Sequence, residues 1–183
     1  MNILIFASYY YPHIGGYDKN VHELAKRLVV KGHRVHVLTC NTEKTTSIEL
    51  VDGVLVFRMN CYHLLGKTYP VPIPFGKFFN ELFILRQRHC DIVITQTRFF
   101  ILSFLGLLFA KLNRIPLIHV ERGTCHSIVS NKLISIIAQI IDHTMGFSIV
   151  KGANANVGVS NAACKFIEHL GGCDTMTIYN GIE

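Results

Sequence analysis

Two short clusters of residues have the types and spacing that bind an anionic or hydroxyl-bearing ligand. The first is the glycine pair Gly15-Gly16, which follows a short apolar run at residues 2–7 and precedes a helical pattern. Glycines in front of a helix let the backbone approach a ligand closely and present amide N–H groups to an anion. A plain turn is the alternative interpretation, and a lone glycine pair does not decide between the two.

The second cluster follows an apolar run at residues 116–120 and consists of Glu121, Arg122, Gly123 and Thr124. A charged pair at the end of a buried strand is well placed to meet a ligand. Arg122 can hold a phosphate or a carboxylate through two parallel N–H donors. The alternative is a structural Glu–Arg pair at the rim of the domain.

Histidines and cysteines give no recognisable metal motif. His13 and His119 are predicted near the ligand cleft, and seven further histidines are interpreted as surface or rim residues: His22, His33, His36, His63, His89, His143 and His169. The six cysteines form no C-x-x-C pair and have no histidine at zinc-finger spacing, so we interpret them as reduced core residues. The sequence therefore predicts no metal and no cofactor. It also contains no G-x-S-x-G elbow and no P-loop, so no catalytic residue is assigned.

The elements that must position these residues alternate along the chain. Residues 2–39 read as strand, glycine loop, helix and strand, which is a right-handed parallel crossover with its ligand site at the carboxyl ends of the strands. Asp18 is expected to cap the helix, and Gly32 to end it. Further strands are predicted at 54–58, 91–95, 116–120, 154–159 and 176–179, and further helices at 76–88, 100–112, 131–150 and 160–170.

Two stretches are predicted to lack regular structure: residues 41–52, which are polar, and residues 61–75, which contain three prolines. In the helix at 76–88, four apolar residues are expected to face the core: Phe79, Leu82, Phe83 and Leu85. The overall alternation predicts an α/β fold, a Rossmann-like doubly wound parallel sheet of about six to seven strands.

Composition limits the class of protein. The chain has 183 residues, half of them hydrophobic, and a formal charge of +6. This excess suits a phosphorylated ligand or an anionic membrane surface. No run of five basic residues occurs, so nucleic acid is not a predicted partner. The apolar stretch at 99–110 is shorter than the roughly 20 residues of a membrane span and is interpreted as a buried helix.

A dinucleotide-binding domain is the obvious competitor, and the sequence argues against it. The loop between the first strand and helix has no G-x-G-x-x-G pattern. The second strand runs into Thr39-Cys40-Asn41, without an acidic residue to bind a ribose hydroxyl.

Six motifs in order along the chain resemble the N-terminal half of the retaining glycosyltransferases of family 4, which have the GT-B fold. They are P-x-x-G-G at 12–16, the H-x-L-A and G-H-x-V pieces at 22–25 and 32–35, D-I-V at 91–93, R-I-P-L at 114–117, A-N-A-N-V-G-V-S at 153–160 and N-G-I-E at 180–183. The resemblance covers essentially the whole chain.

This resemblance implies transfer of a sugar from a nucleotide-sugar donor to a glycan or lipid-linked acceptor, with retention of anomeric configuration. It implies that the N-terminal half binds the acceptor and that the glycine loop lies against the donor. The implied substrate-binding residues are His13, Gly15, Gly16, Glu121, Arg122, Gly123 and Thr124. Such enzymes often serve polysaccharide or lipopolysaccharide biosynthesis, so we expect a cytoplasmic protein, peripheral at the inner membrane face.

The chain departs from the family pattern in two ways. Arg122 stands where the family often has the histidine of E-H-G-T. Residues 1–179 are expected to form the N-terminal domain and 180–183 to begin the linker to a donor-binding domain that is absent or encoded as a separate chain. An incomplete and inactive transferase would have an open cleft lined by Gly15, Gly16 and Arg122, beside an apolar surface for the partner domain. The alternative, a non-catalytic binding module that retains only the fold, would have a filled or blocked cleft.

Overall fold

The computed structural model describes residues 1–64, 69–73, 77–126 and 132–181. An eight-stranded sheet forms the centre, in the order β10-β9-β8-β7-β1-β2-β4-β3, and all neighbouring strands are parallel except β3 and β4. Its strands are β1 (Asn2–Phe6), β2 (Arg34–Cys40), β3 (Ile48–Val51), β4 (Val54–Met59), β7 (Ile92–Gln96), β8 (Leu117–Glu121), β9 (Ala155–Gly158) and β10 (Thr175–Thr177).

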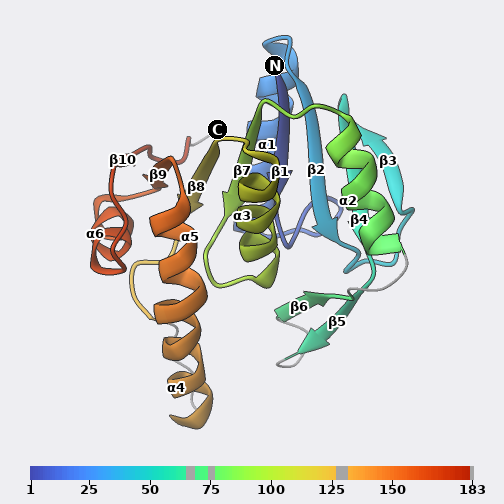
Figure 1. The fold of residues 1–183 in the computed structure, drawn as a ribbon. Coiled ribbons are helices and arrows are strands. Elements are labelled where there is room, and N and C mark those ends of the chain that lie inside the picture. The colour runs from blue at the N-terminus through green and yellow to red at the C-terminus, as the bar shows by residue number, and fades with distance from the viewer. Residues whose placement is uncertain (65–68, 74–76, 127–131, 182–183) are drawn as a thin grey trace.

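Helices pack on both faces of this sheet, with α1 on one face and α2, α3 and α5 on the other (Figure 1). The helices are α1 (Gly16–Val30), α2 (Lys77–Gln87), α3 (Ile101–Asn113), α4 (Lys132–Ile141), α5 (Phe147–Gly152) and α6 (Asn161–His169), and a π-helical turn, η1 (Asp142–Gly146), joins α4 to α5. The predicted doubly wound α/β fold is confirmed.

The apolar runs of the strands make two cores because successive side chains point to opposite faces of the sheet. Leu4 and Phe6 of β1 pack with the α2, α3 and α5 face, whereas Ile3 and Ile5 pack with Val21 and other residues of the α1 face. The near-continuous hydrophobic strands are thereby explained, since both of their faces are buried.

Two stretches expected to be irregular contain strands. Within residues 41–52 the edge strand β3 pairs antiparallel with β4. Within residues 61–75, β5 (Cys61–Leu64) and β6 (Tyr69–Pro72) form a separate two-stranded sheet. Pro70 and Pro72 are tolerated there because alternate residues of a strand point their backbone N–H away from the partner. A proline at every second position therefore breaks no bond of the ladder.

The expectation for the predicted helix at 76–88 was wrong for two of its aromatic residues. Leu85 is buried and Leu82 is half-buried, but the side chains of Phe79 and Phe83 are 61% and 60% exposed. Positions 82 and 85 lie one turn apart on the face that meets the sheet. Phe79 and Phe83, spaced by four residues, lie on a neighbouring face.

The C-terminal end of α1 agrees with the prediction, and its N-terminal end does not. Gly32 has a left-handed backbone, with φ of +85°, and ends the helix as expected. The residue that precedes the first turn is Gly15, and Asp18 does not cap it: Asp18 is buried within the first turn and bonds to His13. The start of α1 therefore has no capping side chain at Gly15.

Candidate functional site

A polar cavity of about 570 Å³ opens at the carboxyl ends of three neighbouring strands, β1, β7 and β8. It is lined by Tyr9, His13, Gly15, Gly16, Tyr17, Asp18, Thr97, Phe100, Arg122 and Gly123. In the sheet, β2 lies on one side of β1 and β7 on the other. The connection after β1 therefore runs in one direction across the sheet and the connection after β7 in the opposite direction, so the gap between β1 and β7 is the topological switch point. In doubly wound folds this is the crevice where ligands bind.

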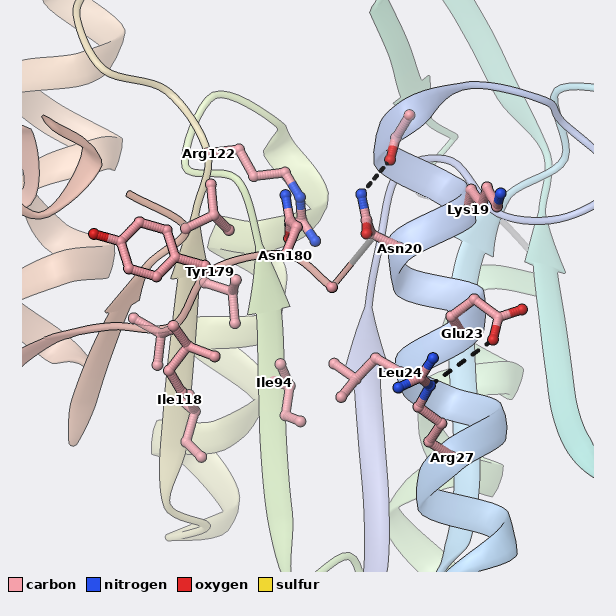
Figure 2. Close-up of a pocket in the computed structure, with 16 residues that line it drawn as sticks. Lys19, Asn20, Glu23, Leu24, Arg27, Ile94, Ile118, Arg122, Tyr179 and Asn180 are labelled. Carbon is pink, nitrogen blue, oxygen red and sulfur yellow. Dashed lines mark hydrogen bonds and ion pairs between the residues drawn. The ribbon is translucent and has the colours of Figure 1, made fainter. Parts of the chain in front are cut away.

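A second cavity, also about 570 Å³, adjoins the first and runs along α1 over the strands β7, β8 and β9 (Figure 2). Its floor is apolar and consists mainly of Ile94, Ile118, Val120 and Val157. Gly16 and Arg122 line both cavities. We call the first the polar pocket and the second the apolar groove.

The structure brings together five of the seven sequence-predicted site residues. His13, Gly15, Gly16, Arg122 and Gly123 all line the polar pocket. Their role as substrate ligands remains a prediction.

The other predicted residues lie elsewhere. Thr124 is exposed and lines neither cavity. The side chain of Glu121 is buried beneath the pocket. His119 was expected near the cleft, but this expectation was wrong: its side chain is 0% exposed, and its Nδ1 lies 3.0 Å from the hydroxyl oxygen of Thr95. His36, interpreted as a surface or rim residue, is also buried, because it faces the core from the middle of β2.

The two glycines have different reasons to be glycine. A Cβ on Gly15 would lie 2.8 Å from the Oδ1 atom of the buried Asp18, so a side chain there would have to displace that carboxylate. A Cβ on Gly16 would meet nothing within 4 Å. The space beside Gly16 is open to a ligand, at the positive end of the α1 dipole and next to its free first-turn N–H groups.

His13 is held in place by a buried carboxylate. Its Nδ1 lies 2.8 Å from Oδ2 of Asp18, whose side chain is 1% exposed. An ionised carboxylate only accepts hydrogen bonds, so Nδ1 carries the proton and Nε2 is left for another partner. The His13 ring also packs on Tyr9, with ring centroids 4.5 Å apart. The pair fixes an imidazole at the wall of the polar pocket.

Arg122 lies between the cavities and is held by two side chains. Its guanidinium is 5.1 Å from the centroid of the Tyr17 ring and donates from Nη1 to Oε1 of Gln96. Burial lowers the pKa of Arg122, while the neighbouring Tyr17 and Glu121 act in the opposite direction. The side chain thus brings a partly desolvated positive charge to the pocket, where it attracts anions more strongly than in water.

Several buried polar atoms around Arg122 have no hydrogen-bond partner among the described residues. They are Nε of Arg122, Nε2 of Gln96 and Oγ1 of Thr97. Thr97 also has a left-handed backbone, with φ of +61°, which is rare for a β-branched residue. Buried polar groups in folded proteins are nearly always paired, and two of these three residues, Arg122 and Thr97, also line the polar pocket.

Aromatic rings complete the polar pocket. Phe100 lies edge-on to Tyr9, with centroids 5.7 Å apart, and Tyr17 is 6.0 Å from Phe100. Burial raises the pKa of Tyr17, so its hydroxyl stays protonated at neutral pH. The pocket therefore combines an apolar aromatic wall with positive charge and backbone donors, an arrangement that suits a phosphorylated sugar.

Glu121 organises the loop that carries Arg122. Its carboxylate accepts from the backbone N–H groups of Arg122 and Gly123, at 2.8 and 2.6 Å. Its charge partner is Arg98, not Arg122 as the sequence suggested: Nη1 of Arg98 lies 3.0 Å from Oε1. Burial alone would raise the pKa of Glu121, but the hydrogen bond with His119 and the charge of Arg98 lower it to about 2.

Sequence reasoning missed Arg98, Asp142 and the aromatic residues of the pocket. Arg98 also pairs with Asp142, with Nε 3.0 Å from Oδ1. One signal for Arg98 was available in the sequence. Thr97-Arg98 follows strand β7, just as Glu121-Arg122 lies at the end of β8. The carboxyl ends of these two adjacent parallel strands lie at the same edge of the sheet, so the two pairs of residues are brought together. No sequence signal indicated Asp142, which lies in a helical stretch.

The family model described as Glycosyltransferase Family 4 matches residues 14–183. This chain belongs to glycosyltransferase family 4. The curated relatives include an uncharacterised glycosyltransferase of Methanocaldococcus jannaschii, 34% identical over 190 residues, with 100% of this chain and 48% of the relative covered. Another, the alpha-monoglucosyldiacylglycerol synthase of Streptococcus pneumoniae, is 26% identical over 119 residues, or 65% of this chain and 26% of that protein.

Solved structures show the same fold. The Anabaena protein HepE in complex with UDP and glucose has a TM-score of 0.60 at 18% identity, covering all of this chain and 45% of HepE. The sucrose-phosphate synthase of Thermosynechococcus elongatus has a TM-score of 0.66 at 15% identity and is covered over 48% of its length. The family 4 chain thus has the fold of a GT-B N-terminal domain and spans about half the length of these proteins.

Proposed function

We propose that this chain is the N-terminal, acceptor-binding domain of a retaining glycosyltransferase, which moves a sugar from a nucleotide-sugar donor to a glycan or lipid-linked acceptor. The observation that carries the proposal is the polar pocket at the switch point. It combines the start of α1, the open space beside Gly16 and the guanidinium of Arg122. These features are complementary to a diphosphate and the sugar attached to it.

Each group has a part in this proposal. The first-turn N–H groups of α1 and the guanidinium of Arg122 bind the phosphate oxygens. Nε2 of His13 binds sugar hydroxyls, and the rings of Tyr9 and Phe100 pack against the apolar face of the sugar. Arg122 here supplies a permanent charge where a histidine would supply a neutral or charged ring.

The apolar groove supports a role for a second domain. Its sheet floor faces a cavity, not a packed helix, and residues 178–181 also line it, with Tyr179 on the side away from α1 (Figure 2). We propose that the donor-binding half of the enzyme covers this face, that residues 180–183 begin the linker to it, and that the chain by itself is inactive. The alternative, a binding module without chemistry, predicts a filled or blocked cleft, and the open polar pocket favours the transferase domain over it.

Membrane contact at the inner face is the second part of the proposal, and α4 supports it. Its exposed apolar residues follow the spacing of one helical face: Leu133, Ile136, Ile137 and Ile140. The helical segment Lys132–Gly152 is also long and apolar enough to cross a membrane by length and composition. Its second half is packed in the domain, however, with Ile149 and Val150 at 0% and 1% exposure. An α4 that lies at the interface fits this packing better than a span.

The experiment that tests the donor site is an NMR titration of the ¹⁵N-labelled chain with UDP-glucose. We expect saturable shifts at the amides of Gly15, Gly16 and Gly123. An Arg122→Gln variant should bind about tenfold more weakly, the loss expected for one charge-assisted hydrogen bond. The matched control is Arg114→Gln, an exposed arginine at the opposite end of β8. Shifts confined to other surfaces, or an unchanged affinity in Arg122→Gln, would refute the assignment of the pocket.

A further inference from the structure

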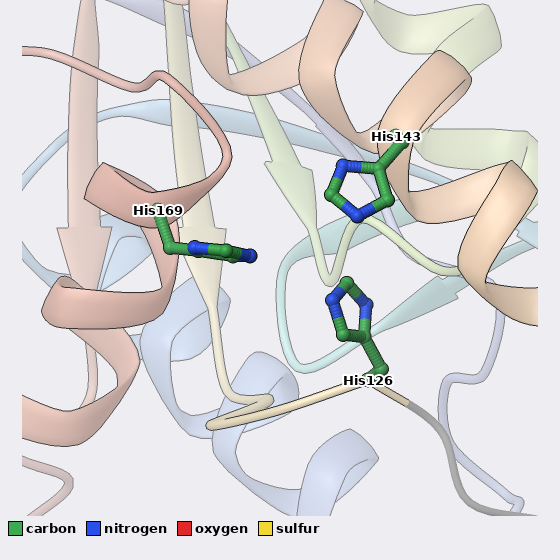
Figure 3. Close-up of side chains that lie close together, drawn as sticks. All are labelled: His126, His143 and His169. Carbon is green, nitrogen blue, oxygen red and sulfur yellow. The ribbon is translucent and has the colours of Figure 1, made fainter.

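Three histidines from separate segments gather beside the candidate site. His126 follows β8, His143 lies in the π-helical turn η1, and His169 is the last residue of α6 (Figure 3). Their nearest potential ligand nitrogens all lie within 4.8 Å of one another. Ring centroids are 5.0 Å apart for His126 and His143, and 5.8 Å for His126 and His169. The cluster is outside both cavities.

A buried carboxylate orients one of the three rings. Nδ1 of His126 lies 2.9 Å from Oδ2 of Asp142, whose side chain is 0% exposed. Asp142 is ion-paired with Arg98, so it accepts and Nδ1 of His126 donates. Nε2 of His126 then carries the free lone pair. A carboxylate behind a histidine is the arrangement that fixes the ring and raises its basicity in protein metal sites.

The distances are close to those of a transition-metal site. The nitrogens of a tetrahedral zinc site lie about 3.4 Å apart, because each Zn–N bond is about 2.1 Å long. The side chains of His143 and His169 are exposed, so their rotation can close the remaining gap. His126 is the fixed member, packed against the ring of Phe166 with centroids 5.0 Å apart.

We propose that His126, His143 and His169 bind one divalent transition-metal ion, with Asp142 as the group that orients His126. Neutral imidazole is a preferred ligand of Zn²⁺, Ni²⁺ and Cu²⁺, and three histidines leave one position for water. These three histidines have no recognisable metal-ligand spacing along the chain, so the sequence alone does not predict a metal there. The argument for this metal site does not rest on the proposed sugar-transfer function.

A metal ion bound at this site would cross-link three segments of the chain. It ties the loop after β8 to η1 and to the end of α6. It also continues into the candidate site through His126, Asp142, Arg98 and Glu121, in that order, and Glu121 holds the backbone of Arg122. A bound ion thus fixes the loop that brings Arg122 to the polar pocket.

The test is calorimetric titration of Zn²⁺ into the chelator-treated chain, purified without a polyhistidine tag. We expect one Zn²⁺ per chain. His143→Gln and His169→Gln should each weaken binding by about tenfold or more, since even outer groups of metal sites are worth 10–100-fold. His33→Gln is the matched control and should bind as the parent does, because His33 is a half-exposed histidine just before the amino end of β2, whereas His126 follows the carboxyl end of β8.

A second readout does not depend on the variants. Zn²⁺ added to the parent chain should shift the ring C–H signals of the three cluster histidines and leave that of His33 in place. Absence of one-to-one binding, equal affinity in His143→Gln and His169→Gln, or ring shifts confined to other histidines would overturn the proposal. The cluster would then be only a packing arrangement of aromatic rings around Phe166.

Discussion

The guanidinium of Arg98 lies 3.0 Å from the carboxylate of Glu121, and the two side chains are 2% and 0% exposed. Arg98 comes from the end of β7 and Glu121 from the end of β8, so the pair joins the two loops that form one side of the polar pocket. The same carboxylate accepts from the backbone of Arg122. A residue that touches no ligand therefore determines where the proposed anion-binding arginine lies.

Removing the positive member of this pair should be costly. In Arg98→Met, Glu121 and Asp142 remain buried without their shared cation, and breaking a buried ion pair costs about 3–5 kcal/mol. Urea denaturation should show this loss in the free energy of unfolding. Arg27→Met, at a largely exposed pair with Glu23, is the control and should change it by less than about 1 kcal/mol. A loss for Arg98→Met as small as that of the control would mean that the network adds little to stability.

Stability should also fall in acid because of Glu121. Its pKa is lowered from 4.5 to about 2 by His119 and Arg98 despite burial. A carboxyl whose pKa is depressed in the folded state stabilises the fold above its unfolded pKa, and this contribution disappears as the pH falls from about 4.5 to about 2. The amount is about 3 kcal/mol.

Urea denaturation at a series of pH values checks this expectation, with Glu121→Gln as the comparison. Other carboxylates also contribute to acid unfolding, so the informative quantity is the difference between the two proteins. That difference in stability should narrow steadily below about pH 4.5. A difference that stays constant down to about pH 3 would show that Glu121 titrates normally.

The two glycines should respond in opposite ways to alanine. Gly15→Ala places a Cβ 2.8 Å from Oδ1 of Asp18 and should destabilise the chain by about 1–3 kcal/mol, the usual cost of overpacking. Gly16→Ala meets no atom within 4 Å and should leave stability equal or raise it by up to about 1 kcal/mol, since alanine is the better helix former.

Binding separates these variants further. We expect Gly16→Ala to weaken UDP-glucose binding although it folds at least as well as the parent, because the methyl group enters space proposed for the donor. Thermal unfolding and the NMR titration give the two quantities. Full affinity in a stable Gly16→Ala variant would show that the ligand does not approach α1 closely.

The sequence predicted the parts of the fold that depend on periodicity. Buried parallel strands and the amphipathic α1 leave clear apolar patterns, and their alternation gave the doubly wound sheet. It did not predict β3, which is four residues long and mostly exposed, or the β5–β6 hairpin, in which prolines occupy two of the four positions of β6. Side-chain partners were harder still: Glu121 pairs with Arg98, 23 positions away, and not with its neighbour Arg122. Such pairing depends on strand order, which adjacent residues do not encode. The three-histidine cluster was not predicted for the same reason, because its members come from separate segments that only the folded chain brings together.

The exposed face of α4 gives a prediction about membranes. Ile136 and Ile140 lie one turn apart on this face, at 46% and 57% exposure, on a chain with a formal charge of +6. Such a face binds an anionic surface through apolar burial and charge together. The parent chain should float with vesicles that contain phosphatidylglycerol at low salt, and Ile136→Glu/Ile140→Glu should lose this binding, because carboxylates are repelled by the surface and cannot enter the acyl region. Leu112→Glu is the control, since Leu112 is 82% exposed at the end of α3, where the strands of the sheet begin.

Retention on vesicles by the α4 variant, or equal loss in Leu112→Glu, would mean that charge alone attracts the chain and that α4 does not enter the membrane. In that case a lipid-linked acceptor would have to reach the polar pocket without help from this helix.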